Sequence, residues 1–273
     1  MNTSNLPSDN DLWAPLRRTT RARIGLGRAG NSLPTRRVLE FQAAHAAARD
    51  AVHDPLDVDD LVDRLQHAGI SAPLQVRSRA ASRDEYLHRP DLGRSPADLS
   101  GLPKTDSADI GIVLADGLSP RALTAHAAGM VDALVREFDS RYRIAPLVIA
   151  TQARVALGDY IGQALGVKTM LVLIGERPGL SVADSLGIYL THRPVPGLTD
   201  ADRNCISNIH PPDGLDYPTA AAIAASLVAA ARKLGRSGVG LKDARSRFRP
   251  VGRDGSVRRS APADGPRRPS AWR

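Results

Sequence analysis

Cysteine is almost absent from this chain of 273 residues, in which Cys205 is the only one. A single cysteine excludes a disulfide within the chain and a structural zinc site built on cysteines. The 7 histidines show no spacing typical of metal ligands, such as His-Glu-x-x-His, so the sequence predicts no protein-bound metal. The low cysteine content favours a reducing compartment, and we therefore expect a cytoplasmic protein.

Long hydrophobic runs are lacking as well. No uninterrupted apolar run approaches the roughly 20 residues that a membrane-spanning helix needs, and the most apolar strand candidate, residues 169–174, is far shorter. The first residues of the chain are polar and show no apolar segment typical of a signal peptide. We therefore expect a protein that has no membrane partner and is not exported.

The excess of positive charge is confined to the end of the chain. The formal net charge is +8, but residues 242–273, with ten Lys and Arg against three Asp and Glu, carry +7 of it. This segment is rich in proline, serine and glycine and has no apolar periodicity, which predicts a disordered, Arg-rich tail. Such a tail can bind nucleic acid through the phosphates. Because residues 1–241 carry only +1, we favour a solvated extension and expect no nucleic-acid partner.

The apolar pattern divides the remaining residues into three parts. Residues 1–12 are polar, which indicates a flexible arm. Within residues 13–103, apolar side chains at three- and four-residue steps predict helices at 34–54 and 57–67, so we expect a small helical lobe and a connection. Residues 104–241 follow a different pattern, which predicts a second, α/β lobe.

In the second lobe, short β-rich runs alternate with amphipathic helices, as is typical of a doubly wound, Rossmann-like α/β sheet. The expected strands are residues 110–114, 146–150, 169–174 and 186–191, and the expected helices are 120–138, 156–165 and 218–234. Ligands of open parallel sheets bind beyond the carboxyl ends of the strands. The loops that follow these strands are therefore the candidates for a binding site.

Four polar loops stand in those positions, at residues 116–119, 151–155, 175–180 and 202–210. In the third loop, Glu176 and Arg177 lie between two glycines, which indicates a functional role; an internal ion pair is the alternative. In the fourth loop, Cys205 is a candidate nucleophile with His210 as its base. No third partner is identified for that pair, so we favour packing or ligand contact for Cys205.

A literal G-x-G-x-x-G at residues 25–30 raises the alternative of a self-sufficient oxidoreductase that binds NAD. The dinucleotide fingerprint requires a buried strand directly before the glycines, because the turn must deliver the pyrophosphate to a helix N-terminus. Residues 17–23, which precede the motif, are strongly basic and do not form a buried strand pattern. We therefore give this alternative little weight, although protection by NAD in a thermal melt would favour it.

Five strings stand in a fixed order along the chain. They are RIGLGRAGNSLPT at 23–35, YLHRPDLGR at 86–94, ADGLS at 115–119, GERPGL at 175–180 and ADRNCISNIH at 201–210. Together they resemble the small subunit (light chain) family of adenosylcobalamin-dependent ethanolamine ammonia-lyase. The resemblance extends from about residue 13 to residue 235 and leaves out the basic tail.

The resemblance implies an ammonia-lyase that converts ethanolamine to acetaldehyde and ammonia by a radical mechanism, which homolysis of the cobalt–carbon bond starts. It implies that this chain clamps the cobalamin against a large catalytic subunit, in a hetero-oligomer of six large and six small subunits, and is not active alone. The family's substrate pocket lies in the large subunit, so no catalytic residue is expected here. Base-on binding is permitted, because the Asp-x-His-x-x-Gly motif that would replace the lower ligand is missing from the sequence.

Carried over by position, the family's cobalamin contacts fall on Val155, Glu176 and Cys205, and the corrin itself holds the cobalt. All three residues lie on the loops that the sheet rule nominates independently. Family members enclosed in bacterial microcompartments can carry a longer N-terminal extension, whereas about a dozen residues precede the resemblance here. Free cytosolic enzyme and an encapsulated enzyme therefore both stay open.

Overall fold

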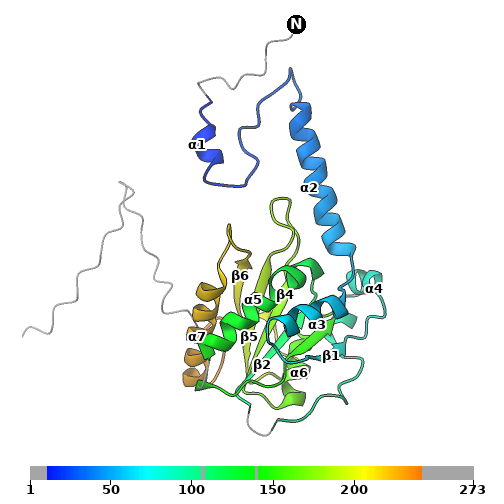
Figure 1. Ribbon diagram of the computed structural model, residues 1–273, viewed down its shortest axis with the longest axis vertical. Coiled ribbons are helices and arrows are strands. Elements are labelled where there is room, and N and C mark those ends of the chain that lie inside the picture. The colour runs from blue at the N-terminus through cyan, green and yellow to red at the C-terminus, as the bar shows by residue number, and fades with distance from the viewer. Residues whose placement is uncertain (1–10, 106–107, 139–140, 242–273) are drawn as a thin grey trace, which may run out of the picture.

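The computed structural model describes residues 11–105, 108–138 and 141–241. The architecture is mixed α/β, with a six-stranded sheet, helices on both of its faces, and a helical segment that rises from one edge of the sheet (Figure 1). Most of the predicted flexible arm at residues 1–12, and all of the predicted tail at residues 242–273, lie outside the described residues.

The sequence predicts five of the helices and four of the strands, which differ from the expected ranges by a few residues. The helices are α1 (Ala14–Arg17), α2 (Thr35–His53), α3 (Val58–His67), α4 (Arg83–His88), α5 (Pro120–Phe138), α6 (Leu157–Leu165) and α7 (Tyr217–Leu234). The strands are β1 (Leu74–Arg77), β2 (Ile110–Ala115), β3 (Val148–Thr151), β4 (Thr169–Gly175), β5 (Leu186–His192) and β6 (Asn204–Ile209). The sequence does not predict α1, α4, β1 or β6.

The strand order across the sheet is β1-β3-β2-β4-β5-β6. The pairs β1–β3, β3–β2 and β2–β4 are parallel, whereas β5 is antiparallel to both of its neighbours. The expected doubly wound pattern therefore covers only part of a mixed sheet. A parallel connection requires a crossover, usually a helix. Residues 176–185, which join β4 to β5, contain no helix, so the chain returns antiparallel along β4.

Hydrophobic side chains fill both sides of the sheet. On one side, α3, α5 and α7 pack against the strands, and Leu65, Met130 and Val228 are among the buried residues. On the other side, α6 packs through Leu157 and Ile161. Every residue of β2 is buried, as expected for a central strand covered on both faces.

The structure corrects the expected division of the chain near residue 103. Strand β1 belongs to the segment expected to be helical, yet it pairs with β3 through the register Leu74↔Val148. Helix α3 belongs to the same segment, and its Leu61 and Leu65 lie in one core cluster with α5 and α7. The expected N-terminal lobe therefore contributes to the sheet and to its core.

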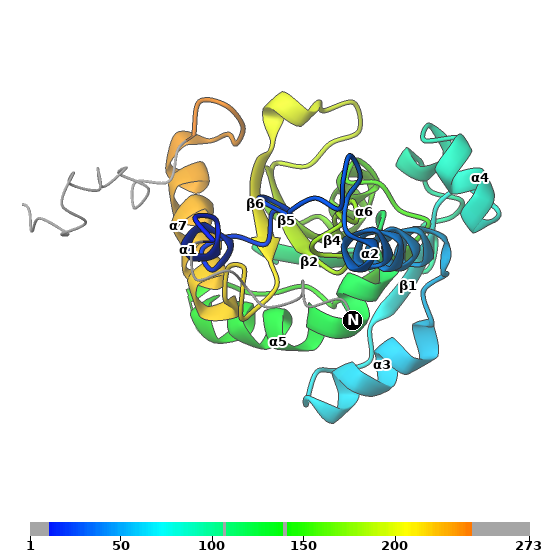
Figure 2. The same ribbon diagram turned by 90° about the horizontal axis from the view of Figure 1, so that it is seen from above.

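Residues 11–53, here called the projection, stand away from the sheet and comprise α1, a connecting loop and α2 (Figure 1). Seen from above, the connecting loop crosses over β5 and β6 on its way from α1 to α2 (Figure 2). It contacts the β4–β5 loop, where Arg21 and Arg23 donate hydrogen bonds to the carbonyl oxygens of Ser181 and Leu180 at 3.3 and 3.2 Å. The projection thus lies over the carboxyl edge of β4.

Candidate functional site

A cavity of about 450 Å³ opens at the carboxyl ends of the central parallel strands. This volume lies within the range of roughly 300–1,000 Å³ that small-molecule sites occupy. Three of the four candidate loops contribute to the cavity, as the rule for ligand sites in open sheets predicts. The lining residues are Tyr86, Gly117, Leu118, Arg154, Val155, Ile174, Gly175, Glu176, Arg177 and Tyr189.

The cavity brings together two of the three residues to which the resemblance assigns a cofactor contact. Val155 lies two residues before α6, and Glu176 lies directly after β4. Cys205 does not line the cavity, but it is the β6 partner of Tyr189, which does. The three residues therefore share one region of the sheet, with Cys205 displaced toward the outer strand.

Hydrogen bonds fix the carboxylate of Glu176 at the wall of the cavity. Its Oε2 atom accepts from the hydroxyl of Ser185 at 2.5 Å and from the backbone N–H of Asn208 at 3.1 Å. Gly187 gives the side chain room, because a Cβ there would lie 2.9 Å from Oε1. No ion pair between Glu176 and Arg177 occurs among the described side chains. The carboxylate therefore ties the β4–β5 loop to the end of β6.

Cys205 lies on the open side of β6, and its thiol touches Tyr189. Desolvation and the negative charge of Glu176 raise the pKa of Cys205, although the contact with Tyr189 acts in the opposite sense. Desolvation and the neighbouring Cys205 also raise the pKa of Tyr189, to about 12. Both groups are therefore neutral at physiological pH, which suits packing or hydrogen bonding more than nucleophilic attack.

His210 is not placed to act as a base toward Cys205. Cys205 pairs with Tyr189, whereas Ile209, the residue before His210, pairs with Leu186, which at about 3.3 Å per residue lies roughly 10 Å away along β5. The Nε2 atom of His210 instead donates to Oδ1 of Asn208 at 2.8 Å. Packing or ligand contact therefore stays the favoured interpretation of Cys205.

Arg83 and Tyr86 of α4 and Arg154 of the loop after β3, here called the cationic wall, lie beside the cavity, and the sequence does not predict this arrangement. Two guanidinium groups lie over the ring of Tyr86, with the Cζ atoms of Arg83 and Arg154 at 4.9 and 4.6 Å from its centroid. The hydroxyl of Tyr86 donates to the carbonyl oxygen of Ala153 at 3.2 Å. Burial raises the pKa of Tyr86, so the phenol remains neutral. The string YLHRPDLGR contains Tyr86, but its spacing alone does not reveal this stacking.

Asp116 holds two of the cavity loops together from below. Its buried carboxylate accepts the backbone N–H groups of Gln152 and Ala153 at 2.8 and 2.9 Å. The Nη1 atom of Arg83 lies 3.5 Å from Oδ2 of Asp116. The Nε atom of Arg83 also donates to the carbonyl oxygen of Val52 in α2, at 2.8 Å. Burial raises the pKa of Asp116, while these hydrogen bonds and Arg83 oppose that effect. The carboxylate thus connects the loop after β2, the loop after β3 and, through Arg83, the base of the projection.

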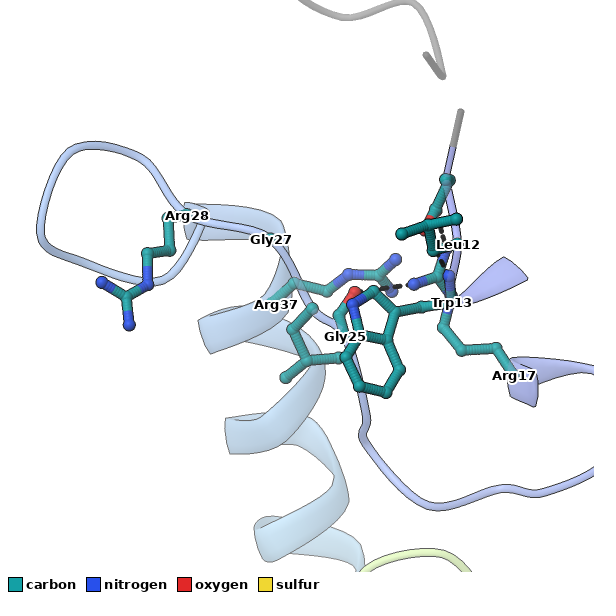
Figure 3. Close-up of a pocket in the computed structure, with 9 residues that line it drawn as sticks. Leu12, Trp13, Arg17, Gly25, Gly27, Arg28 and Arg37 are labelled. Carbon is teal, nitrogen blue, oxygen red and sulfur yellow. Dashed lines mark hydrogen bonds and ion pairs between the residues drawn. The ribbon is translucent and has the colours of Figure 1, made fainter. Parts of the chain in front are cut away.

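The G-x-G-x-x-G string lies in the connecting loop of the projection and does not line this cavity. Gly25 has a φ of +54°, and a Cβ at this position would lie 2.1 Å from Cγ of Trp13. Figure 3 shows the indole of Trp13 against Gly25, with Arg28 pointing away from both. The next helix, α2, begins only at Thr35. The glycine therefore permits a close approach of Trp13, and the motif lacks the strand–turn–helix context of a dinucleotide site.

The described residues contain no cluster of side chains suited to a metal ion. Within 11–105, 108–138 and 141–241, no three His, Cys, Asp or Glu side chains gather as a metal ion requires. In the same ranges, none of the helices has the length and apolar content needed to cross a bilayer.

A family model of the ethanolamine ammonia-lyase light chain (EutC) matches residues 10–242. The chain belongs to this family. The ethanolamine ammonia-lyase small subunit of Rhodococcus erythropolis is 65% identical over 233 residues, which cover 85% of this chain and 90% of the relative. Those of Ralstonia nicotianae and Azotobacter vinelandii are 49% and 47% identical, covering 85% and 87% of this chain and 88% and 90% of the relatives. The resemblance predicted from five short strings is thus confirmed for this light chain.

The family name has two consequences for this light chain. A light chain, or small subunit, implies a larger partner subunit, and an ammonia-lyase implies a subunit of a carbon–nitrogen lyase. A self-sufficient NAD-dependent oxidoreductase finds no support in these relatives or in the geometry around Gly25.

Proposed function

We propose that this chain is the cofactor-clamping subunit of an adenosylcobalamin-dependent ethanolamine ammonia-lyase. In this proposal the complex converts ethanolamine to acetaldehyde and ammonia, the cobalamin is held base-on between this chain and the large subunit, and this chain is not active alone. The bound cofactor supplies the radical chemistry, and the protein supplies position and shielding. The observation that carries the proposal is the cavity that Val155 and Glu176 line together at the carboxyl ends of the strands.

The chemistry of the cavity fits the amide-bearing rim of a corrin. Glu176 offers a carboxylate that accepts from amide N–H groups, and Tyr189 offers a neutral hydroxyl. Two buried polar atoms beside it, Arg154 Nε and Gln152 Oε1, have no hydrogen-bond partner among the described residues. A buried donor or acceptor without a partner is costly, so a ligand that supplies amide groups would relieve that cost.

The size of the cavity supports a site shared between two chains. A volume of about 450 Å³ accommodates only part of a molecule as large as a cobalamin. The remainder would extend over the open side of β5 and β6, where Cys205 is exposed, and against the large subunit. In this arrangement Val155 and Cys205 make van der Waals contact, Glu176 orients the rim, and the Asp116–Arg83 pair keeps the loops in place.

Family membership is the support for the rest of the assembly. We propose a hetero-oligomer of six large and six small subunits in the cytoplasm, either free or enclosed in an ethanolamine-utilisation microcompartment. The chemistry of ethanolamine cleavage belongs in this proposal to the large subunit, so no catalytic residue is assigned to this chain.

Co-expression with the large subunit from the same genome tests the proposal. The copurified complex should form acetaldehyde from ethanolamine only when adenosylcobalamin is added, and each subunit alone should be inactive. Titration of the complex with cobalamin, followed by its visible absorption, measures binding apart from turnover. A chain that neither copurifies with the large subunit nor affects cobalamin binding, and that NAD protects in a thermal melt, would restore the oxidoreductase alternative.

A further inference from the structure

The projection exposes apolar side chains that the core of the sheet does not use. Six of the eleven large apolar residues exposed in the described parts of the chain belong to it, with exposed fractions from 45% to 82%. They are Leu12, Trp13, Leu16, Leu33, Leu39 and Phe41. Larger patches of exposed apolar surface typically mark sites of protein–protein contact.

Packing within the chain does little to hold the projection in place. Helix α2 has 19 residues, of which Ala51 alone is buried. Most helical stability in proteins comes from the burial of an apolar face, and α2 buries little of its surface within this chain. Apart from Ala51, the contacts to the body that the structure shows are mainly polar: Arg21 and Arg23 bind the β4–β5 loop, Arg21 also pairs with Asp213, and Arg83 reaches Val52. A helix with so little buried surface requires a partner that covers it.

The projection also differs in charge from the rest of the chain. Residues 11–53 contain eight arginines against Asp11, Glu40 and Asp50, a net charge of +5, whereas residues 54–241 carry −3. Two of the arginines, Arg18 and Arg28, are exposed and flank the apolar residues. Complementary potentials guide association and disfavour like-charged partners. The surface that covers the projection should therefore be acidic, and the projection of a second copy would repel this one.

The position of the projection relates it to the cavity. Its connecting loop crosses over β5 and β6 (Figure 2) and contacts Leu180 and Ser181 in the loop that begins with Glu176. Arg83, which pairs with Asp116 beneath the cavity, also donates to Val52 at the end of α2. A chain bound to the projection would therefore also face the edge of the sheet at which the cavity opens.

We propose that the projection is the docking element for the large subunit, and that it binds an acidic surface with apolar pockets for Leu16 and Leu39. The inference rests on the proposed function, because it takes the large subunit as the occupant. Docking there places the large subunit over the carboxyl edge of the sheet, so the cofactor lies between the two chains. The contacts of Arg21 and Arg23 with the β4–β5 loop couple docking to the position of Glu176.

The test compares two double variants of the full chain for binding to separately purified large subunit. Leu16→Ser with Leu39→Ser removes two apolar residues of the projection, which are 50% and 58% exposed. Val135→Ser with Leu234→Ser removes two residues of the body that are 44% and 47% exposed, and serves as the matched control. We expect the first variant to raise the dissociation constant at least tenfold and the control to leave it unchanged. Thermal melts of the isolated variants verify that both fold.

A charge variant provides an independent measurement. Arg18→Glu with Arg28→Glu should weaken binding and reduce the dependence of the dissociation constant on ionic strength, because screening acts on exposed charges. Equal binding by wild type and both projection variants would overturn the docking inference while the active complex still supported the proposed function. If this chain alone forms a dimer, and the Leu16 and Leu39 changes dissociate it, a second copy of the chain covers the projection. That result would also overturn the docking inference. Failure of the wild-type chain to bind the large subunit at all would overturn both proposals.

Discussion

Arg203 and Asp159 form a buried, two-pronged ion pair between the residue before β6 and helix α6. Both contacts, Nη1 to Oδ1 and Nη2 to Oδ2, measure 2.8 Å, and each side chain is 2% exposed. The guanidinium also donates to the carbonyl oxygen of Leu198 at 2.9 Å and to the hydroxyl of Thr191 at 3.2 Å. The pair thus connects the antiparallel strands to the helix that follows the cavity loop of Val155.

Replacement of Arg203 by alanine should strongly destabilise the protein. The change leaves the carboxylate of Asp159 buried without its partner, which typically costs about 3–5 kcal/mol. Urea unfolding followed by circular dichroism measures the loss. Arg136→Ala, which removes an exposed pair with Asp132, is the control and should change stability by less than about 1 kcal/mol. A similar small loss for both variants would show that the buried pair contributes nothing beyond a surface pair.

Asp109 should make the stability of the protein depend on acidity below pH 4. Although burial opposes its ionisation, hydrogen bonds from Lys168, from the backbone N–H of Arg143 and from Arg232 lower the pKa of Asp109 to about 2. A carboxyl group with a lowered pKa contributes stability above its unfolded pKa, near 3.8, and loses it as the pH falls toward 2. Because Lys168 is half exposed, we expect a contribution of roughly 1–2 kcal/mol at pH 7.

The Asp109→Asn variant tests this expectation. Its stability should be lower than that of the wild type at pH 7, and the difference should shrink between pH 4 and pH 2, where the wild-type carboxyl becomes protonated. Chemical denaturation at several pH values measures both quantities. Asp132→Asn, at an exposed pair, is the control and should keep the wild-type dependence in this range. A difference that stays constant down to pH 2 would contradict the assignment.

Gly117 should tolerate no side chain, because the backbone of β4 comes too close. Its φ is +57°, and a Cβ would lie 2.3 Å from the carbonyl oxygen of Gly175. Gly30 has a similar φ, +62°, but a Cβ there would meet no atom within 4 Å. Gly30→Ala should therefore cost only the left-handed strain of roughly 1–2 kcal/mol. In urea unfolding, Gly117→Ala should lose at least about 2 kcal/mol more stability than Gly30→Ala. Equal losses for the two variants would show that the backbone around Gly117 shifts easily to admit a side chain.

Glu176 should affect the cofactor requirement and leave the substrate requirement unchanged. In the complex with the large subunit, Glu176→Ala should raise the cobalamin concentration for half-maximal activity about tenfold, since a hydrogen bond to a charged group is worth about 1.5–3 kcal/mol. The KM for ethanolamine should not change. Glu176→Gln keeps one acceptor oxygen, so its cobalamin concentration for half-maximal activity should fall between those of the wild type and Glu176→Ala. Glu137→Ala, at the end of α5, is the control, and an unchanged cobalamin requirement in Glu176→Ala would remove this residue from the site.

The candidate site could be predicted in part. Val155 and Glu176 follow strands whose apolar runs are evident in the sequence, and the resemblance and the sheet rule both point to them. Tyr86 and Arg83 could not be placed this way, because they lie on the short helix α4, outside the expected α/β segment. Only the folded chain brings α4 beside the loops after β2 and β3. The cationic wall is therefore a tertiary feature.

The secondary structure could also be predicted only in part from the sequence. Strands β2 and β4 are buried along their whole length, so their apolar runs predict them. Strand β6 alternates exposed residues such as Cys205 and Ser207 with the buried Ile206, and its run of small polar residues resembles a loop. Strand β1 has four residues, of which Val76 alone is buried. Pairing defines both strands: β6 pairs with β5, and β1 pairs with β3, which lies far along the chain.

The amino-acid sequence was sufficient to predict the family, the main helices and strands, and the loops on which the candidate contacts lie. Those features depend on apolar periodicity and on short strings, which are local properties of the chain. The antiparallel β5, the membership of β1 in the sheet, the stacking around Tyr86 and the position of the projection over the cavity edge emerge only in the folded chain. Apart from the direction of β5, each of these depends on contacts between residues distant in the sequence, and local periodicity does not specify which distant surfaces bury one another.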